Sequence, residues 1–265
     1  MPKGHMMKTS LKALAVAAGL LAGAGLGAAP ARAAGGEDHL PEVHFSFNGP
    51  FGHFDRASAQ RGFQVYKEVC SNCHSMRLLS YRNLRELGLS DAEVRAIAAT
   101  VQVTDGPNDE GQMFERPGRP SDRFHSPFAN EKAARAANNG ALPPDLSVIT
   151  KAREGGASYI HALLNGYEDP PAGVTLMPGM NYNKYFAGHQ IAMAQPLSSD
   201  GQVEYTDGTK PTVDQMTRDV AQFLTWAAEP EMEQRKALGV KMVLFFTVLG
   251  GLAYAVKRKI WADVH

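Results

Sequence analysis

Apolar side chains recur every three or four residues in three stretches of the chain, and this spacing predicts three helices that each pack on one face. The first helix has a cap at Asp55 or Ser58, and the second follows a capping box at Ser90. The third follows a capping box at Thr212 and stops before Pro230. The three stripes are Phe63, Tyr66 and Val69; Val94, Ile97 and Val101; and Met216, Val220, Phe223 and Ala227.

Turn residues and shorter patterns predict the rest of the domain. A short helix over residues 133–137 ends at an Asn-Gly pair, and another, capped by Ser158, ends at a second Asn-Gly pair. Residues 105–130 are rich in Gly, Pro and polar side chains, which favours a long loop. Two Asp-Gly pairs flank Val203 and Tyr205 and indicate a small β-hairpin. We therefore expect a mainly α fold with long loops and one small hairpin.

The C-terminal end has the composition of a transmembrane helix. Residues 237–256 are apolar apart from Lys241, and a helix of this length, at about 1.5 Å per residue, spans the ~30 Å hydrocarbon core of a bilayer. A cluster of cations at 257–259 follows at once, and the positive-inside rule places it in the cytoplasm. A buried core helix is the alternative. We expect a single-pass anchor with a short cytoplasmic tail over residues 231–265.

The N-terminal end has the pattern of a secretory signal peptide. Two lysines precede a run of small apolar residues over 13–29, and Ala31-Arg32-Ala33 supplies an Ala-x-Ala cleavage site. A second membrane anchor is the alternative, but the processing site favours removal of residues 1–33. The exported part of the chain is then expected in the periplasm of a bacterium, attached to the inner membrane.

The zero net charge of the 265-residue chain conceals an uneven distribution. Between Gly35 and Pro230, 24 acidic residues outnumber 17 basic ones, a net charge of about −7, while both ends of the chain are basic. Much of the acid lies in one loop and one Glu-Asp pair: Asp105, Asp109, Glu110, Glu115, Asp122, Glu168 and Asp169. An acidic exported domain favours a cationic partner. Nothing in the sequence indicates nucleic-acid binding.

Five consecutive residues carry the strongest chemical signal: Cys70, Ser71, Asn72, Cys73 and His74. Cys-x-x-Cys-His is the attachment pattern of c-type haem, because two thiols at this spacing reach both vinyl groups of one haem edge and the next histidine reaches the iron. A thioredoxin-like redox pair, half of a zinc site and a simple disulfide are the alternatives. The chain has no other cysteine, so a second pair of thiol ligands for zinc is absent. We expect one covalent haem c with His74 as an iron ligand.

The sixth iron ligand decides what such a haem can do. Methionine makes an electron carrier of high potential, histidine lowers the potential, and an open site allows small-molecule chemistry. The candidates after the haem motif are Met113, Met177, Met180, Met193, Met216 and His189. Met216 lies on the apolar stripe of a helix and Met113 in a charged loop, whereas small residues flank Met193 and let its loop approach a haem face. The residues alone favour Met193 and leave the other loop methionines and His189 open.

Four stretches of the chain resemble the cytochrome c1 family. They are Arg-Gly-Phe-Gln-Val-Tyr at 61–66, Asp-Gly-Pro-Asn at 105–108, the stretch 134–147 with its Asn-Asn-Gly-Ala-Leu-Pro-Pro-Asp-Leu-Ser, and Trp-Ala-Ala-Glu-Pro at 226–230. The resemblance runs from Arg61 to Trp261. It implies a class I cytochrome c-like helical haem domain over residues 57–230, preceded by an N-terminal arm over 34–56.

The resemblance also implies the residues around the haem. In that family the sixth ligand is a methionine in an Ile-Gly-Met-Ala-Pro-Pro type segment, which matches Met193, with Ala192 and Gln195 in place of the glycine and the first proline. The implied pocket residues are Asn138, Ala141, Pro143, Pro144, Arg153, Tyr159, Leu163, Leu164 and Phe186. Arg153 matches the arginine that pairs with a haem propionate, for which a guanidinium is well suited. Ordinary packing or a solvated charge is the alternative at each position.

By this resemblance the chain is the electron-transfer subunit of ubiquinol–cytochrome c reductase. It would take electrons from the Rieske iron–sulfur protein, pass them to a cationic cytochrome c, and dock in the membrane beside cytochrome b. Two other readings remain. One is a different membrane-anchored cytochrome c that feeds an oxidase, and the other is a haem peroxidase or sensor with an open iron site.

Overall fold

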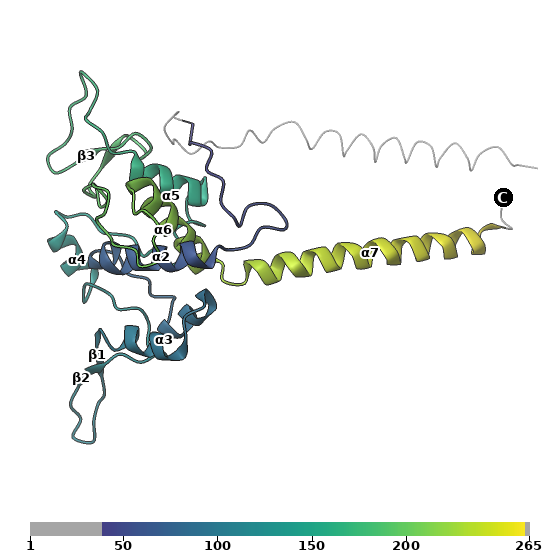
Figure 1. Cartoon of the computed structure of the whole chain (residues 1–265), viewed down its shortest axis with the longest axis horizontal. Coiled ribbons are helices and arrows are strands. Elements are labelled where there is room, and N and C mark those ends of the chain that lie inside the picture. Colours follow the sequence, from purple (N-terminus) through teal and green to yellow (C-terminus); the bar gives the residue numbers. More distant parts are fainter. Residues whose placement is uncertain (1–38, 263–265) are drawn as a thin grey trace, which may run out of the picture. The chain divides into compact units, whose positions relative to one another are not determined.

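The computed structural model describes residues 39–262, which form a mainly α domain and one long C-terminal helix (Figure 1). The helices are α2 (Arg56–Glu68), η1 (Cys70–Asn72), η2 (Tyr81–Leu87), α3 (Asp91–Ala98), α4 (Glu131–Ala137), α5 (Gly156–Asn165), α6 (Val213–Ala228) and α7 (Met232–Ile260). Two antiparallel strand pairs complete the fold: β1 (Gln102–Asp105) with β2 (Phe114–Pro117), and β3 (Asn181–Tyr182) with β4 (Gln190–Ile191). The predicted signal peptide lies outside the described residues.

The centre of the fold is the contact between α2 and α6, which come from opposite ends of the domain. At Gly62 the two backbones touch, because a Cβ atom added there would lie 2.0 Å from the carbonyl oxygen of Asp219 and 2.7 Å from the Cβ of Phe223. Only glycine fits so close an approach. The stripes predicted for these two helices therefore face each other, as Phe63 and Phe223 do at a ring distance of 5.6 Å.

One buried carboxylate reinforces this contact. Asp219 on α6 is 0% exposed, and it accepts hydrogen bonds from three side chains: Ser58 at 2.6 Å, Gln215 at 3.0 Å and the Nε of Arg61 at 2.8 Å. The guanidinium supplies the opposite charge, so the carboxylate is buried with its charge balanced and its oxygens bonded. The pair thus fixes the register of α2 on α6.

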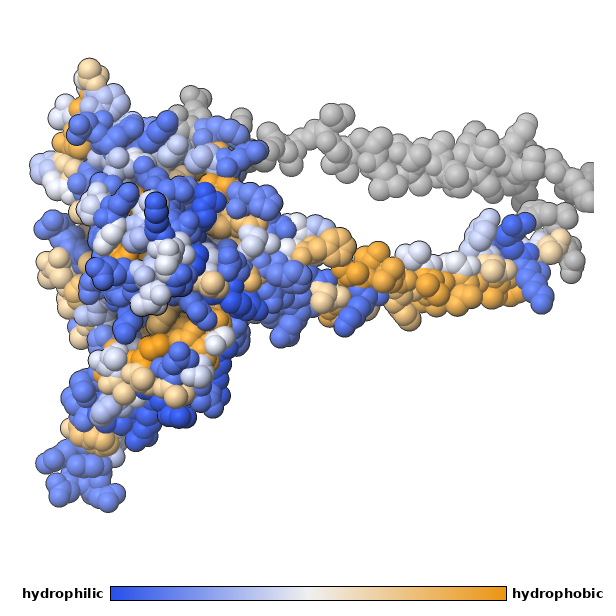
Figure 2. All heavy atoms as spheres, in the orientation of Figure 1, coloured by the Kyte–Doolittle hydropathy of each residue, from blue (hydrophilic) through white to orange (hydrophobic). Residues whose placement is uncertain are grey.

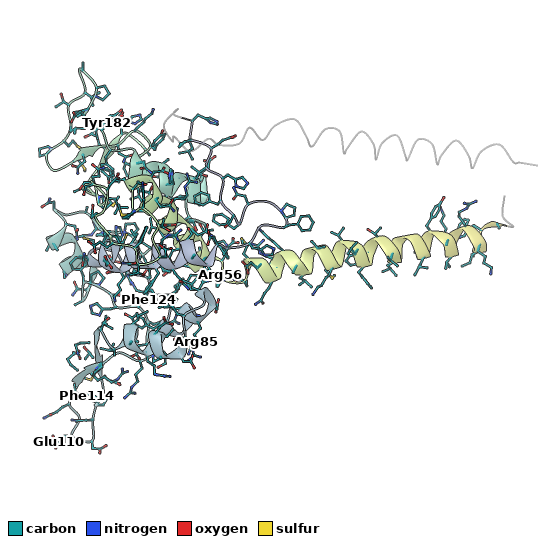
Figure 3. All side chains as sticks on the ribbon, viewed as in Figure 1. Arg56, Arg85, Glu110, Phe114, Phe124 and Tyr182 are labelled. Atoms are coloured by element: carbon teal, nitrogen blue, oxygen red, sulfur yellow. The ribbon has the colours of Figure 1, made fainter. Side chains whose placement is uncertain are left out.

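Aromatic rings fill the space on the far side of α2. Phe124 stacks on Tyr81 of η2 at 4.8 Å and on Tyr66 of α2 at 5.9 Å, and it lies close to α2 in Figure 3. Its backbone N–H donates to the carbonyl of Leu79, which ties the loop before it to the segment after the haem motif. Offset aromatic pairs of this kind add packing energy to the burial of the rings.

The predicted caps are mostly confirmed. The Asp55 side chain accepts from Ser58 N–H at the start of α2, a capping box opens α3 at Ser90, and Thr212 caps α6. The cap predicted at Ser158 is wrong, because α5 already begins at Gly156, after a left-handed residue at 155. A glycine reaches that conformation without strain, so the helix begins three residues earlier than a cap at Ser158 would allow.

The small hairpin exists, but its predicted place at residues 200–208 is wrong. There the side chains of Asp200 and Asp207 accept from backbone N–H groups, so the segment is a series of turns instead of a ladder. The hairpin is β1–β2, whose second strand lies inside the segment 105–130 that was predicted as loop. Arg116 on β2 bonds to Asp105 on β1, and this cross-strand ion pair helps to hold a polar sequence as strands; Arg116 also bonds at 2.7 Å to Asp122 in the segment after β2.

Two further segments join the domain to α7. The N-terminal arm contributes Phe45, Phe47 and Phe54 to the core, where they are 4%, 9% and 5% exposed. The first residue of α7, Met232, is also buried, at 4%.

An 18-residue window of α7 has a mean hydropathy of 1.8 and none of it is buried, so α7 is long and apolar enough to cross a membrane. Figure 2 shows its apolar surface ending in a charged cluster.

Candidate haem site

The Cys-x-x-Cys-His motif forms a tight turn at the C-terminal end of α2. The turn is the 3₁₀-helix η1, closed by hydrogen bonds from the N–H groups of Cys73 at 3.1 Å and His74 at 2.9 Å to the carbonyl of Cys70. The Ser71 hydroxyl and the Asn72 amide bond to the last free carbonyls of α2. Both cysteines are free thiols on the same turn. The helix end thus presents two thiols and one imidazole together.

The orientation of His74 leaves one ring nitrogen free. Its Nδ1 lies 2.8 Å from the carbonyl oxygen of Pro144. A carbonyl only accepts, so Nδ1 carries the proton and Nε2 carries a lone pair. Burial lowers the pKa of His74, although the Pro144 bond and Asp145 oppose the shift, so the ring is neutral at neutral pH. A neutral imidazole held through its other nitrogen is the usual form of a metal-ligating histidine.

The segment containing Pro143 and Pro144 is fastened beside the haem motif. Leu146 N–H donates to the Ser75 carbonyl at 2.8 Å, and the Asp145 carboxylate accepts from the Ser75 hydroxyl at 2.8 Å. Burial opposes the charge of Asp145, but hydrogen bonds led by those from Ser147 hold its pKa below the usual range. The carboxylate therefore stays ionised and keeps the Pro144 carbonyl in place for His74.

Hydrogen bonds to backbone carbonyls hold the loop that carries Met193. The hydroxyl of Tyr167 donates to the Met193 carbonyl at 3.0 Å, and the amide of Asn181 donates to the same oxygen at 3.3 Å and to the carbonyl of Ile191 at 3.4 Å. The Met193 side chain is half-buried and packs against the core. The β3–β4 pair brings Asn181 opposite Ile191, and a separate bridge pairs Tyr167 with Asn183, so both donors lie close to the methionine. No signal in the sequence identified Tyr167 or Asn181.

The other candidate ligands differ in burial. Met216 is 0% exposed within the core, whereas Met113 and Met177 are 61% and 57% exposed. Met180 is half-buried beside an open cavity of about 430 Å³, which Tyr167 also lines. His189 stacks on Tyr182 with ring centres 5.7 Å apart, and its Nδ1 is buried without a partner among the described residues. Core packing, as predicted, accounts for Met216.

Most of the residues predicted to line the haem are partly buried. Asn138, Ala141, Pro143, Tyr159, Leu163 and Phe186 are neither in the core nor fully exposed. Leu164 differs because it is buried at 8%, and Pro144 and Arg153 are exposed. Burial raises the pKa of Tyr159, and the nearby Arg153 opposes that shift. We call Tyr159, Leu163 and Phe186 the wall residues: each leaves part of its side chain exposed, and Arg153 lies near Tyr159.

These observations fit a covalent haem better than the alternatives. Half-buried apolar side chains, an imidazole nitrogen and a thioether are the groups that a porphyrin and its iron need, and the predicted residues include all three. Burial raises the pKa of the Cys70 thiol to about 12, whereas a reactive redox pair has a lowered thiol pKa. Among residues 39–262, no group of three or more His, Cys, Asp or Glu side chains is placed to hold a metal ion.

Comparisons with known proteins agree with this chemistry. The model of the Cytochrome C1 family matches residues 45–264. The chain is 46% identical to the cytochrome c1 of Rhodospirillum rubrum, over 97% of the chain and 99% of that protein. It is 51% identical to "Cytochrome c1, heme protein, mitochondrial" of Saccharomyces cerevisiae, over 85% of the chain and 73% of that protein. It is also 50% identical to "Cytochrome b/c1" of Bradyrhizobium diazoefficiens, where 99% of the chain spans only 41% of the relative's length.

Proposed function

The chain belongs to the cytochrome c1 family, and from this premise we propose that it is the membrane-anchored haem subunit of a ubiquinol–cytochrome c reductase. In this role it carries electrons from the Rieske iron–sulfur protein to a cytochrome c. The observation that carries the proposal is the arrangement at His74. The turn that presents Cys70 and Cys73 also presents an imidazole whose Nδ1 is bonded to Pro144 and whose Nε2 is free.

Haem c is the cofactor that the family implies, and when bound it supplies one iron that gains and loses a single electron. Cys70 and Cys73 would hold the haem through thioether bonds, and His74 Nε2 and the Met193 sulfur would bind its iron. The Pro144 carbonyl holds the imidazole ring, and Tyr167 holds the methionine loop. A neutral imidazole with a thioether favours the reduced, less charged iron and gives an electron carrier without substrate chemistry of its own.

The wall residues complete this assignment. Tyr159, Leu163 and Phe186 exclude water from the cofactor, which raises the reduction potential because the more highly charged oxidised form is less well solvated. Asn138 caps α4 by donating to the Ala134 carbonyl at 2.7 Å and keeps the following loop against the site. Arg153 pairs with a propionate at the edge of the wall and offsets its negative charge.

The membrane arrangement follows from the two ends of the chain. Residues 231–265 contain α7 and form the anchor, and the cluster at 257–259 lies on the cytoplasmic side. Residues 57–230 form the periplasmic haem domain, and residues 1–33 are removed as a signal peptide. α7 places the domain beside cytochrome b in the membrane of a bacterium.

The acceptor is a cationic cytochrome c. Two acids predicted to attract it, Asp105 and Asp122, are instead paired with Arg116. Asp109 and Glu110 are exposed and form no ion pair with a described residue, and Glu110 lies at the tip of the β1–β2 hairpin in Figure 3. Part of the free charge available for steering a partner therefore lies at that tip, and the exposed Glu168 and Asp169 supply more elsewhere.

Purification of the chain from its native membrane tests the proposal. We expect cytochrome b and an iron–sulfur protein to co-purify with it, and its haem to be low-spin and inert to carbon monoxide. Co-purification with an oxidase alone would identify the oxidase-feeding alternative. A high-spin haem that binds carbon monoxide would identify an open site.

A further inference from the structure

The most exposed large apolar side chain of the described residues is not on α7. Phe51 is 72% exposed, more than any apolar residue of the long helix. It lies at a turn within residues 45–54 of the N-terminal arm, whose other phenylalanines are buried in the core. The turn is rigid, since Gly52 N–H bonds to the Gly49 carbonyl and His53 N–H to the Ser46 carbonyl. A single aromatic ring therefore projects from a fixed base.

The turn is fastened to the first turns of α7. Lys236 on α7 donates from its Nζ to the carbonyls of Phe47 at 2.5 Å and Gly52 at 3.3 Å. The backbone N–H of Phe54 donates to the Glu233 carboxylate at 2.7 Å. Arg56 bonds to both oxygens of the same carboxylate, and Figure 3 places it near the start of α7. Phe51 thus keeps a defined position relative to the helix.

The turn that carries Phe51 lies beside the residues at which the apolar part of α7 begins. Lys236 directly precedes the apolar stretch 237–256, so the residue that holds the turn is also the last polar residue before the span. At about 1.5 Å per helical residue, the turn lies at the level where the hydrocarbon core of a bilayer would begin. Aromatic side chains are favoured at this interface, with the ring among the headgroups and upper acyl chains.

We propose that Phe51 inserts into the interfacial layer of the lipid bilayer, so that the arm and α7 together form the membrane-docking surface. The surroundings of Phe51 favour lipid over a protein partner. Its neighbours in the turn are Asn48, Gly49, Pro50 and Gly52, so the tip offers one ring and little other side-chain surface. A stable protein interface needs a broad patch of about 800 Å² on each partner, whereas one ring is enough to enter a headgroup layer. Phe51 and α7 then hold the haem domain to the membrane at two points, which limits its tilt relative to the bilayer.

A photo-crosslinking experiment on the full chain in its native membrane complex tests this inference. p-Benzoylphenylalanine, which reacts on illumination with whatever C–H bond is nearest, replaces Phe51, Phe245 of α7 or Phe114 of β2 in three separate variants. Phe245 and Phe114 are 57% and 43% exposed, so all three substitutions leave the core intact, and an unchanged haem spectrum verifies this. Peptide mass spectrometry then measures phospholipid adducts at each position.

We expect phospholipid adducts at positions 51 and 245, and about tenfold fewer at position 114, which lies in the hairpin. The inference rests on α7 spanning the membrane, which is part of the proposed function, and position 245 tests that part separately. Lipid adducts at 245 with none at 51 would overturn the inference alone. An adduct from 51 to another subunit instead of lipid would also overturn it. Lipid adducts at neither position would overturn both.

Discussion

The contact between α2 and α6 and the predicted haem site differ in how completely the protein's own side chains bury their apolar surface. Between α2 and α6, Gly62, Asp219 and Phe223 are inaccessible and every polar atom of the Asp219 carboxylate is bonded. Among the residues predicted to line the haem, Tyr159 and Leu163 remain half-buried although they are largely apolar. The core between the helices is complete without a ligand, whereas the wall leaves apolar surface that a flat, apolar cofactor would cover.

The helix α5 belongs to both regions and shows how they are joined. One of its faces points to α6, where His161 bonds to Asp214 at 2.9 Å and Asn165 bonds to Thr217 at 2.7 Å. Its other face carries the half-buried wall residues. Changes on the first face should therefore affect folding, and changes on the second should affect the haem with the fold retained.

The largest effect is expected at Gly62. In the Gly62→Ala variant the new Cβ would lie 2.0 Å from a backbone oxygen, so α2 and α6 must separate, and we expect the free energy of unfolding to fall by about 3 kcal/mol or more. Guanidinium unfolding of the haem-loaded protein, followed by circular dichroism, measures this. Gly239→Ala is the matched control, because no atom lies within 4 Å of its added Cβ. Equal stability of the two variants would mean that the backbones do not touch.

A smaller effect is expected from Tyr167→Phe, which changes the haem site without touching the core. The variant loses one of two hydrogen bonds to the Met193 carbonyl, a net loss of about 1 kcal/mol. We expect imidazole to replace the methionine on ferric haem roughly fivefold faster, with unchanged unfolding. Stopped-flow absorbance measures the rate. Tyr182→Phe is the control, and equal rates in both variants would show that Tyr167 does not hold the ligand loop.

The acidic tip of the hairpin should affect only the encounter with the acceptor. In an Asp109→Asn, Glu110→Gln variant, we expect oxidation by a cationic cytochrome c to slow roughly threefold at ~0.01 M salt and little at ~0.1 M, where the Debye length is about 10 Å. A Glu42→Gln, Glu231→Gln variant removes the same charge elsewhere and should behave as wild type. Rates that do not depend on salt in any variant would show that the charge does not steer the partner.

The smallest effect is expected in the pH dependence of the free energy of unfolding, through His161 on the face of α5 that meets α6. Burial lowers the pKa of His161, and Asp214 only partly offsets the shift. The native state therefore binds a proton less readily than the unfolded state, whose histidine pKa is about 6.5. The stability that His161 contributes is present above that pH and is lost as the pH falls towards the native pKa. We therefore expect the free energy of unfolding to change less between about pH 7.5 and pH 5.5 in His161→Gln than in the wild type. The same change in the variant and the wild type would contradict this.

Local signals in the sequence predicted the helices and the haem motif because the interactions involved are only a few residues long. The caps at Asp55, Ser90 and Thr212 and the attachment turn are of this kind. The place of the hairpin and the support of Met193 were not predicted, because they depend on which residues the fold brings together. Tyr167 and Met193 are 26 positions apart, and no spacing rule connects them.

The junction with α7 is the extreme case of such distant contacts. The arm reaches α7 across more than 170 positions, through the bonds of Phe54 and Arg56 to Glu233. The number of acidic residues in the sequence also overestimated the free negative charge, because the sequence does not show which acids form ion pairs. Asp105 and Asp122 counted as free acids in the sequence, but the fold pairs both with Arg116.

The central claim is that Met193 completes a haem site built for electron transfer, and a redox titration of Met193→Leu tests it most directly. With covalent attachment intact, we expect the reduction potential to fall by roughly 0.1 V or more, within the ~0.8 V that axial ligands control, and the ferrous haem to bind carbon monoxide. Met180→Leu, a half-buried methionine beside the same loop, should keep the wild-type potential and stay inert to carbon monoxide. A wild-type potential and low-spin spectrum in Met193→Leu would contradict the account and assign the sixth position to another residue.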